Sequence, residues 1–291
     1  MCVTFVYLNP SAIGNAKDYQ LIILNNRDES FDRPTSFAGW ENGILAGRDE
    51  AISNERGGTW LGMREDGKIG VLLSMLEKAE SMKTNAPTRG RIVCEYLASK
   101  CTANEYAQLI AEQGSQFNGF NLLLFDRVER NGKILYNLAT VSNSSINANV
   151  ENFYSGVYGF GNSSRLSPFK KVAYGTRLFE DAVKQNMQEK NDDLMIEQFL
   201  RILRDNTCHH PDQQLLSQTD QSEECSRAMS QLFYRFPPPH RYGTRSQTIV
   251  LVKGDGRAVF YECSMINNNG DYGCDDSQWP KTKFVFQLHD P

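Results

Sequence analysis

The sequence lacks several features that would place the chain in a specialised class of protein. It has no apolar run near the roughly 20 residues that a membrane-spanning helix needs, since its longest purely aliphatic stretch covers residues 21–24. The first residues also lack the basic and apolar regions of a secretory signal. No Gly/Ser-rich linker or internal repeat divides the chain. We therefore expect an intracellular, water-soluble protein with a single domain over residues 1–291.

Charge and cysteine spacing exclude further classes. The net charge of −4 and the pI near 5.7 give no overall attraction to phosphate backbones, so we expect no nucleic-acid partner. The seven cysteines are never spaced as C-x-x-C pairs, which argues against a zinc site or a disulfide framework. We expect reduced thiols and no metal centre.

The chain does contain many short apolar runs within an ordinary globular composition, which is 40% hydrophobic. Runs of strand length precede and follow a central helical pattern over residues 170–206, and helices are also expected near residues 92–97 and 103–112. Asp66-Gly67 and Asn131-Gly132 predict hairpins between neighbouring runs. Residues 142–152 and 208–226 are expected to be loops. This order predicts an α+β fold whose sheets are covered by helices.

Cys2 is the first candidate functional residue. Removal of Met1 would leave a residue with both a thiol and a free α-amine, and the amine can act as the base for the thiol. The apolar run behind it predicts a buried strand that would fix the thiol to a sheet. The alternative is a small buried cysteine in a first strand, which on these residues alone is the more common outcome.

A polar group of residues ends the second apolar run, at positions 25–29. A solvated loop is one interpretation of these side chains. The other is that Arg27 and Asp28 lie beside Cys2, where a guanidinium favours the thiolate and a carboxylate holds the amine.

Seven short motifs occur along the chain in a fixed order. They are Met1-Cys2, Asn26-Arg27-Asp28-Glu29, residues 57–62, Arg89-Gly90, residues 119–122, residues 159–162 and Tyr242-Gly243-Thr244-Arg245. In this order the motifs resemble those of the NRDE-domain proteins, the transport and Golgi organisation protein 2 homologues. The resemblance runs from the first residue to the last expected strand.

The resemblance implies a fold and a set of site residues. The fold would be a four-layer αββα sandwich of the N-terminal-nucleophile hydrolase type. By motif, Cys2 matches the nucleophile, and Arg27 and Asp28 match the arginine and aspartate beside it. Asn162 matches an asparagine on the oxyanion side, and Arg245 matches a late active-site arginine. The implied chemistry is attack on an amide or acyl thioester carbonyl, with amide donors holding the oxyanion.

Met75 departs from the family pattern. The family usually has Leu-Thr-Asn where this chain has Leu73-Ser74-Met75, and a thioether cannot donate a hydrogen bond to an oxyanion. Loss of one such donor lowers turnover by about a hundredfold to a thousandfold. We therefore expect a pocket without efficient hydrolysis.

The resemblance also implies two classes of function. Our first hypothesis is a carrier that binds haem as its transported ligand and serves haem homeostasis, with Arg27 and Arg245 suited to the propionates. The alternative is a Cys2-dependent amidohydrolase or thioesterase, or a protein that handles acyl-coenzyme A and lipids. The family implies a cytoplasmic protein associated with mitochondria or Golgi, with transient contact to a membrane or a haem exporter.

Groups able to ligate haem iron are sparse in the sequence. Cys2, Met75 and the pair His209-His210 are candidates, although histidines in a polar loop are more often solvated and no C-x-x-C-H motif is present. His240 follows three prolines and is a candidate for the pocket mouth, with a surface position as the commoner outcome. All of these inferences require Cys2, Asp28 and Arg245 to share one pocket.

Overall fold

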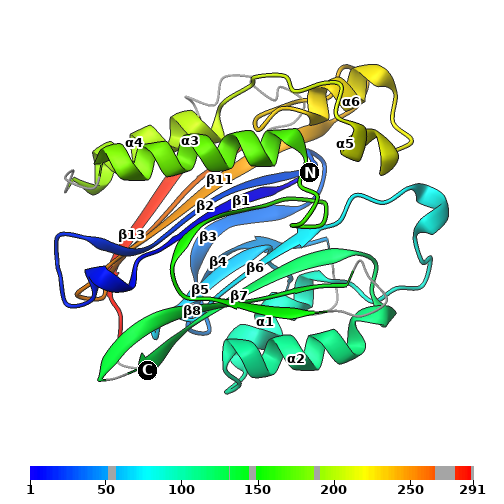
Figure 1. Ribbon diagram of the computed structural model, residues 1–291. Helices are drawn as coiled ribbons and strands as arrows, with labels where there is room; N and C mark the ends of the chain where they lie inside the picture. Colours follow the sequence, from blue (N-terminus) through cyan, green and yellow to red (C-terminus); the bar gives the residue numbers. More distant parts are fainter. Residues whose placement is uncertain (52–56, 131, 144–148, 187–190, 266–278, 290–291) are drawn as a thin grey trace.

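The fold consists of two antiparallel sheets packed face to face, with helices on the outer face of each (Figure 1). The computed structural model describes residues 1–51, 57–130, 132–143, 149–186, 191–265 and 279–289. From top to bottom in Figure 1 the layers are helix, sheet, sheet and helix. The predicted four-layer αββα sandwich is therefore confirmed.

The first sheet contains six of the described strands, in the order β10-β1-β2-β11-β12-β13. The bounds are β1 (Val3–Leu8), β2 (Tyr19–Ser30), β10 (Gly156–Phe160), β11 (Tyr242–Lys253), β12 (Arg257–Ser264) and β13 (Lys281–Gln287). The antiparallel pair expected from the first two apolar runs is present as β1 and β2. Strands from both ends of the sequence thus meet in the middle of this sheet.

The second sheet contains seven of the described strands, in chain order from β3 to β9. The bounds are β3 (Thr35–Glu41), β4 (Ile44–Asp49), β5 (Leu61–Arg64), β6 (Ile69–Ser74), β7 (Phe120–Arg130), β8 (Lys133–Ser142) and β9 (Val150–Phe153). Both predicted hairpins occur in it, since β5 pairs with β6 and β7 pairs with β8.

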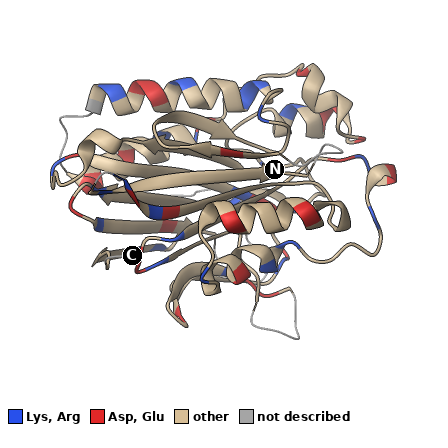
Figure 2. Ribbon diagram, turned by 60° about the horizontal axis from the view of Figure 1, so that its bottom comes forward, with Lys and Arg blue, Asp and Glu red and all other residues tan. Residues whose placement is uncertain are grey.

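Helices cover the two outer faces. Helices α3 (Lys170–Asn186) and α4 (Asp192–Leu203) lie on the first sheet, and α1 (Gly90–Ala98) and α2 (Ala103–Gln113) lie on the second. Figure 2 shows charged residues spaced along these helices, as expected for helices with one buried and one solvated side. A capping box between Thr102 and Glu105 fixes the start of α2.

The continuous apolar run at residues 21–24 illustrates how both faces of the first sheet are buried. Leu21 and Ile23 join the core between the sheets, whereas Ile22 and Leu24 join the core beneath α3 and α4. A strand covered on both sides needs apolar residues at successive positions, which is why this run does not alternate with polar residues.

Two predicted loops were wrong in part. The segment 208–226 contains α5 (Gln213–Ser217) and most of α6 (Glu223–Met229). Asp212 and Ser222 cap these helices by accepting backbone N–H groups. The segment 142–152 includes the start of β9, while residues 144–148 lie outside the described residues.

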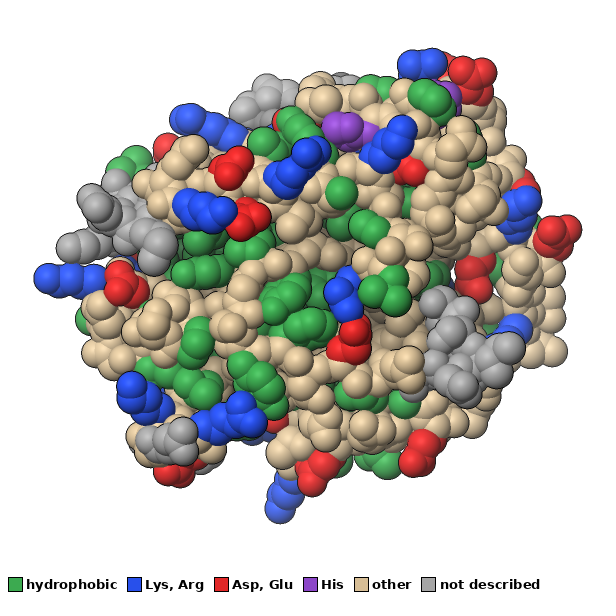
Figure 3. Space-filling model, viewed as in Figure 1, with side chains coloured by type: hydrophobic (Ala, Val, Ile, Leu, Met, Phe, Trp, Pro, Cys, Tyr) green, Lys and Arg blue, Asp and Glu red, His purple; other side chains and the backbone are tan. Residues whose placement is uncertain are grey.

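Residues 25–29 also differ from the expected strand end, because β2 continues through them, paired with β1 as far as Asn26 and with β11 as far as Ser30. Their polar side chains are therefore held on the sheet. Acidic and basic side chains are mixed over the face in Figure 3. Within the described ranges, no helix is long and apolar enough to cross a membrane.

Candidate functional site

The Cys2 thiol lies at a hollow of about 280 Å³ between the ends of the two sheets. The strand that starts one residue after Cys2, β1, lies between β10 and β2 and is therefore paired on both sides. We call this cavity the Cys2 hollow. Its lining residues are Met1, Cys2, Arg27, Asp28, Glu29, Arg33, Asp49, Thr59, Trp60, Leu72, Ser74, Pro87, Thr88, Arg89, Gly90, Asn118, Asn162 and Tyr242.

Three acceptors surround the α-amine of Met1. The amine donates to the Tyr234 hydroxyl at 2.9 Å and to the Tyr242 hydroxyl at 3.4 Å, and it forms an ion pair with Asp28 Oδ2 at 3.4 Å. Asp28 is only 3% exposed, and neither of its carboxylate oxygens accepts a further hydrogen bond in the structure. In this amine subsite, the Met1 amine is therefore the charge partner of a buried carboxylate that accepts no hydrogen bond.

The Cys2 thiol is held against the backbone of the same aspartate. Its Sγ lies 3.8 Å from the carbonyl oxygen of Asp28, to which it can donate, and it accepts the Asp28 N–H at 3.5 Å. Burial raises the pKa of Cys2, and although the Met1 amine and Arg27 oppose that effect, the pKa stays above its ordinary value. At neutral pH the thiol is therefore protonated in this arrangement.

Arg27 joins the two sheets at the base of the hollow. Its guanidinium lies over the Trp60 ring at 4.1 Å from the centroid, donates to Thr35 Oγ1 at 3.0 Å and pairs with Asp49 at 3.3 Å. Arg33 also binds Asp49, at 2.7 Å. Both guanidinium groups therefore form an ion pair with the same carboxylate, that of Asp49.

Arg89 differs from the other cations of the Cys2 hollow because it has no carboxylate partner among the described residues. It precedes α1, and its guanidinium donates to the carbonyl oxygen of Gly119 at 2.5 Å. Burial lowers the pKa of Arg89, with Glu77 and then Glu29 opposing that effect from a distance. No carboxylate of a described residue lies within ion-pair distance of Arg89. Among the described residues, the lining has four cationic groups and three carboxylates, so one positive charge of this set is left unmatched.

A close backbone approach places Arg89 and the start of α1 at the hollow. A Cβ on Gly58 would lie 3.0 Å from the backbone of Gly90, and Thr59 donates its N–H to the Gly90 carbonyl at 3.1 Å. Only a glycine fits this approach without displacement. The motif at residues 57–62 therefore has a local purpose, which is to seat α1 against the second sheet.

Asn162 follows β10 and reaches the same hollow. Its Nδ2 donates to the carbonyl oxygen of Ser74, while its Oδ1 is buried without a hydrogen-bond partner. The structure thus brings together Cys2, Arg27, Asp28 and Asn162, which are four of the site residues named from the sequence.

The other predicted site residues lie outside the lining of the Cys2 hollow. Met75 follows the end of β6, and its Cβ packs where a side chain at Gly119 would be. Arg245 is 4% exposed and donates to the backbone carbonyls of Ser30 and Arg33, at 2.6 and 2.8 Å. It supports the connection from β2 to β3. The expectation that Arg245 shares one pocket with Cys2 is therefore not met.

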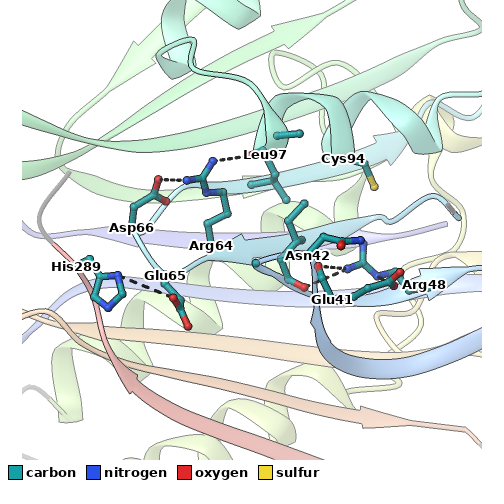
Figure 4. A pocket seen from close by; sticks show the side chains of 12 residues that line it. Glu41, Asn42, Arg48, Arg64, Glu65, Asp66, Cys94, Leu97 and His289 are labelled. Atoms are coloured by element: carbon teal, nitrogen blue, oxygen red, sulfur yellow. Dashed lines mark hydrogen bonds and ion pairs between the residues drawn. The ribbon is translucent and has the colours of Figure 1, made fainter.

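The candidate histidines also lie outside the lining of the Cys2 hollow. The exposed His240 packs on Phe236, and His209 packs on Tyr174. His289 belongs to a second cavity, of about 510 Å³, which shares no lining residue with the Cys2 hollow (Figure 4). In that cavity Arg64 pairs with Asp66 at 3.0 Å and Arg48 pairs with Glu41 at 3.6 Å, while His289 lies 3.9 Å from Glu65 and forms an ion pair with it only when protonated. Both arginines drawn there have a carboxylate partner, so neither is an unmatched cation for an anionic ligand.

Sequence reasoning gave no role to several residues that shape the Cys2 hollow. Trp60 and Arg89 stood within recognised motifs, so a signal for them existed. Asp49 and Tyr234 carried no such signal, because their roles depend on contacts with Arg27 and the Met1 amine.

Comparison with solved structures defines the class of the fold. A crystal structure of a mutant conjugated bile acid hydrolase from Clostridium perfringens superposes with a TM-score of 0.50 and 11% identity, covering 99% of this chain and 92% of that chain. At this identity the similarity shows the fold alone, which is that of the N-terminal-nucleophile hydrolases.

The family follows from the sequence comparisons. Residues 1–267 match the family described as Transport and Golgi organisation 2, and the chain belongs to that family. The Transport and Golgi organization protein 2 homologs of Bos taurus and Homo sapiens are each 30% identical, with 99% of both chains covered. Transport and Golgi organization protein 2 of Drosophila melanogaster is 30% identical, with 91% of this chain and 92% of that protein covered.

Proposed function

We propose that this protein carries an anionic small molecule in the Cys2 hollow, and that haem is the cargo. The observation that supports this proposal is Arg89, a partly buried cation at the cavity wall without a carboxylate partner among the described residues. A desolvated charge is costly unless an opposite charge compensates it. A carboxylate of the ligand would supply that charge.

The start of α1 adds to the attraction for an anion. Gly90, its first residue, lines the hollow, and the N-terminal end of a helix carries a partial positive charge. A haem propionate is a carboxylate and suits a guanidinium in the same way as other carboxylates do. Arg89 thus takes the role that the sequence had suggested for Arg245.

The remaining lining suits the edge of a planar apolar ligand. Trp60, Leu72 and Pro87 supply apolar surface. The volume of about 280 Å³ is at the small end of ligand pockets, which span about 300–1,000 Å³. We therefore propose that the propionate edge of haem enters, while the rest of the macrocycle covers the opening.

A haem titration of matched variants tests the carrier role. Arg89→Gln should weaken haem binding by about tenfold or more, because it removes a charge-assisted contact. Arg91→Gln is the control, since Arg91 is two residues further on, half exposed and paired with Glu95. Binding is followed by the Soret absorption. Equal affinities of the two variants, or binding no tighter than to an unrelated protein, would contradict the proposal.

A second candidate function is hydrolysis of an amide or acyl thioester by Cys2. The observation that favours it is the thiol beside the amine–Asp28 pair. If Met1 is removed, the amine of Cys2 lies one residue from the same acceptors and can serve as the base. Met75 does not line the hollow, whereas Asn162 and Arg89 do, and we propose these two side chains as the oxyanion donors.

The hydrolase candidate is tested by turnover of acyl-coenzyme A and amide substrates. Cys2→Ala should abolish turnover, and mass spectrometry should detect an acyl group on the wild-type thiol. Cys208→Ala is the control, because Cys208 is an exposed thiol outside the hollow. Turnover that survives Cys2→Ala would exclude this role.

The location of the protein remains a prediction. The names of the relatives refer to transport and Golgi organisation. We propose a cytoplasmic protein that associates with mitochondria or Golgi and transfers its cargo in transient contact with a membrane or a haem exporter.

A further inference from the structure

Lys171 is a lysine with no exposed surface, behind the amine subsite. It is the second residue of α3, and its side chain is 0% exposed. Its Nζ donates to the backbone carbonyl of Gln231 at 3.0 Å and lies 5.1 Å from the centre of the Tyr234 ring. No carboxylate of a described residue lies within ion-pair distance of it. A fully buried ammonium with so few partners requires an explanation.

The charged groups on the other side of the Tyr234 ring explain the position of this buried ammonium. The Tyr234 hydroxyl accepts from the Met1 amine, which in turn pairs with Asp28. The Asp28 carboxylate is buried, and its oxygens accept no hydrogen bond. Lys171 has no carboxylate partner among the described residues, whereas Asp28 has the Met1 amine as its partner. Lys171 and Asp28 are too far apart for an ion pair but attract each other, since burial lowers the pKa of Lys171 and Asp28 is the first charge that opposes this effect.

We infer that Lys171 is a positioning residue of the Cys2 hollow, whose ammonium behind Tyr234 balances Asp28 and thereby sets the charge that surrounds the Cys2 thiol. The inference takes the Cys2 hollow to be the functional site, as in the proposed function. Its test, however, needs no ligand, so the two can fail separately.

A purely structural role is the alternative. The carbonyl of Gln231 follows the end of α6, and a cation at a helix C-terminus is stabilising. Lys171 would then hold α3 to α6 and have no effect on the thiol.

Other charged and titratable groups also face this region. Those around Lys171 are Asp28, Cys2, Asp212 and Tyr234. Those around the thiol are the Met1 amine, Asp28, Arg27, Arg89, Tyr234 and Tyr242. A substitution that removes only the charge of Lys171 leaves all of these in place.

The pH dependence of Cys2 alkylation separates the two roles. Loss of a positive charge near the thiol disfavours the thiolate, so Lys171→Met should move the midpoint upward by about half a pH unit or more. Iodoacetamide is the probe, and modification is quantified on the peptide that contains Cys2. Lys170→Met is the matched control, because Lys170 is the neighbouring residue and its Nζ binds Pro211 at the surface.

A second neutral variant separates the loss of charge from a loss of folding. Lys171→Gln keeps a donor for the Gln231 carbonyl but carries no charge, and it should shift the midpoint in the same direction, whereas Lys171→Arg should stay near wild type. Thermal unfolding identifies the folded variants. An unchanged midpoint in a folded neutral variant, or failure of both neutral variants to fold, assigns Lys171 a structural role and overturns the inference.

Discussion

At the scale of single residues, the Cys2 hollow is defined by how its charges are distributed. Arg27, Arg33 and the Met1 amine each have a carboxylate partner, whereas Arg89 has none among the described residues. Paired cations orient their neighbours, and the unpaired one is available to a ligand. This difference distinguishes Arg27, which the sequence suggested as a ligand contact, from Arg89, which the structure favours.

Arg27 should therefore matter chiefly for stability. Arg27→Lys should lower the free energy of unfolding by about 1–3 kcal/mol, because a lysine keeps the charge but loses the planar stack on Trp60 and the contacts to Thr35 and Asp49. Urea unfolding measures the change. Arg130→Lys is the control, since Arg130 also stacks on an aromatic ring, Tyr154, but at the surface. An equal effect of the two substitutions would show that Arg27 does not join the sheets as described.

At the scale of secondary structure elements, the position of α1 depends on its glycine contact with the second sheet. Gly58 approaches Gly90 so closely that an added Cβ would meet backbone atoms, which cannot rotate away. Arg89 immediately precedes this point. A shift of α1 would therefore move the proposed anion contact as well as the packing.

Gly58→Ala should accordingly destabilise the protein by about 1–3 kcal/mol and weaken ligand binding. Gly39→Ala is the matched control, because Gly39 also lies in the second sheet but a Cβ there meets no atom within 4 Å. Its effect should stay within about 0.5 kcal/mol. Thermal unfolding and the haem titration measure the two quantities. If Gly58→Ala changes neither the stability nor the haem affinity, then α1 can shift without loss of either.

The elements that could be predicted were those indicated by residues close together in the sequence. The hairpins at Asp66-Gly67 and Asn131-Gly132 follow from turn residues, and the pairing of β1 with β2 follows from adjacent apolar runs. The helices α5 and α6 were missed because their segment is polar, although Asp212 and Ser222 are typical N-cap residues. The continuation of β2 through Arg27 could not be predicted, because the strand that pairs with it there is β11, far along the chain.

At the scale of the whole molecule, the family resemblance predicted the four layers, and four of the site residues named from the sequence line the Cys2 hollow. Cys2, Arg27, Asp28 and Asn162 meet as expected. Arg245 does not, because the carbonyls that its guanidinium binds belong to a connection whose path no local pattern determines. The single-domain organisation over residues 1–291 stays a prediction.

The position of β1 has a consequence for biosynthesis. Its two neighbours are β2, which follows at once, and β10, which ends at residue 160, while β11 adds the strand beyond β2 only from residue 242 onward. During synthesis on the ribosome, β1 is made first, but the strands that surround it are complete only after most of the polypeptide has been made. Such long-range pairing is slow, so we expect truncated nascent chains to leave the thiol accessible until β11 has emerged.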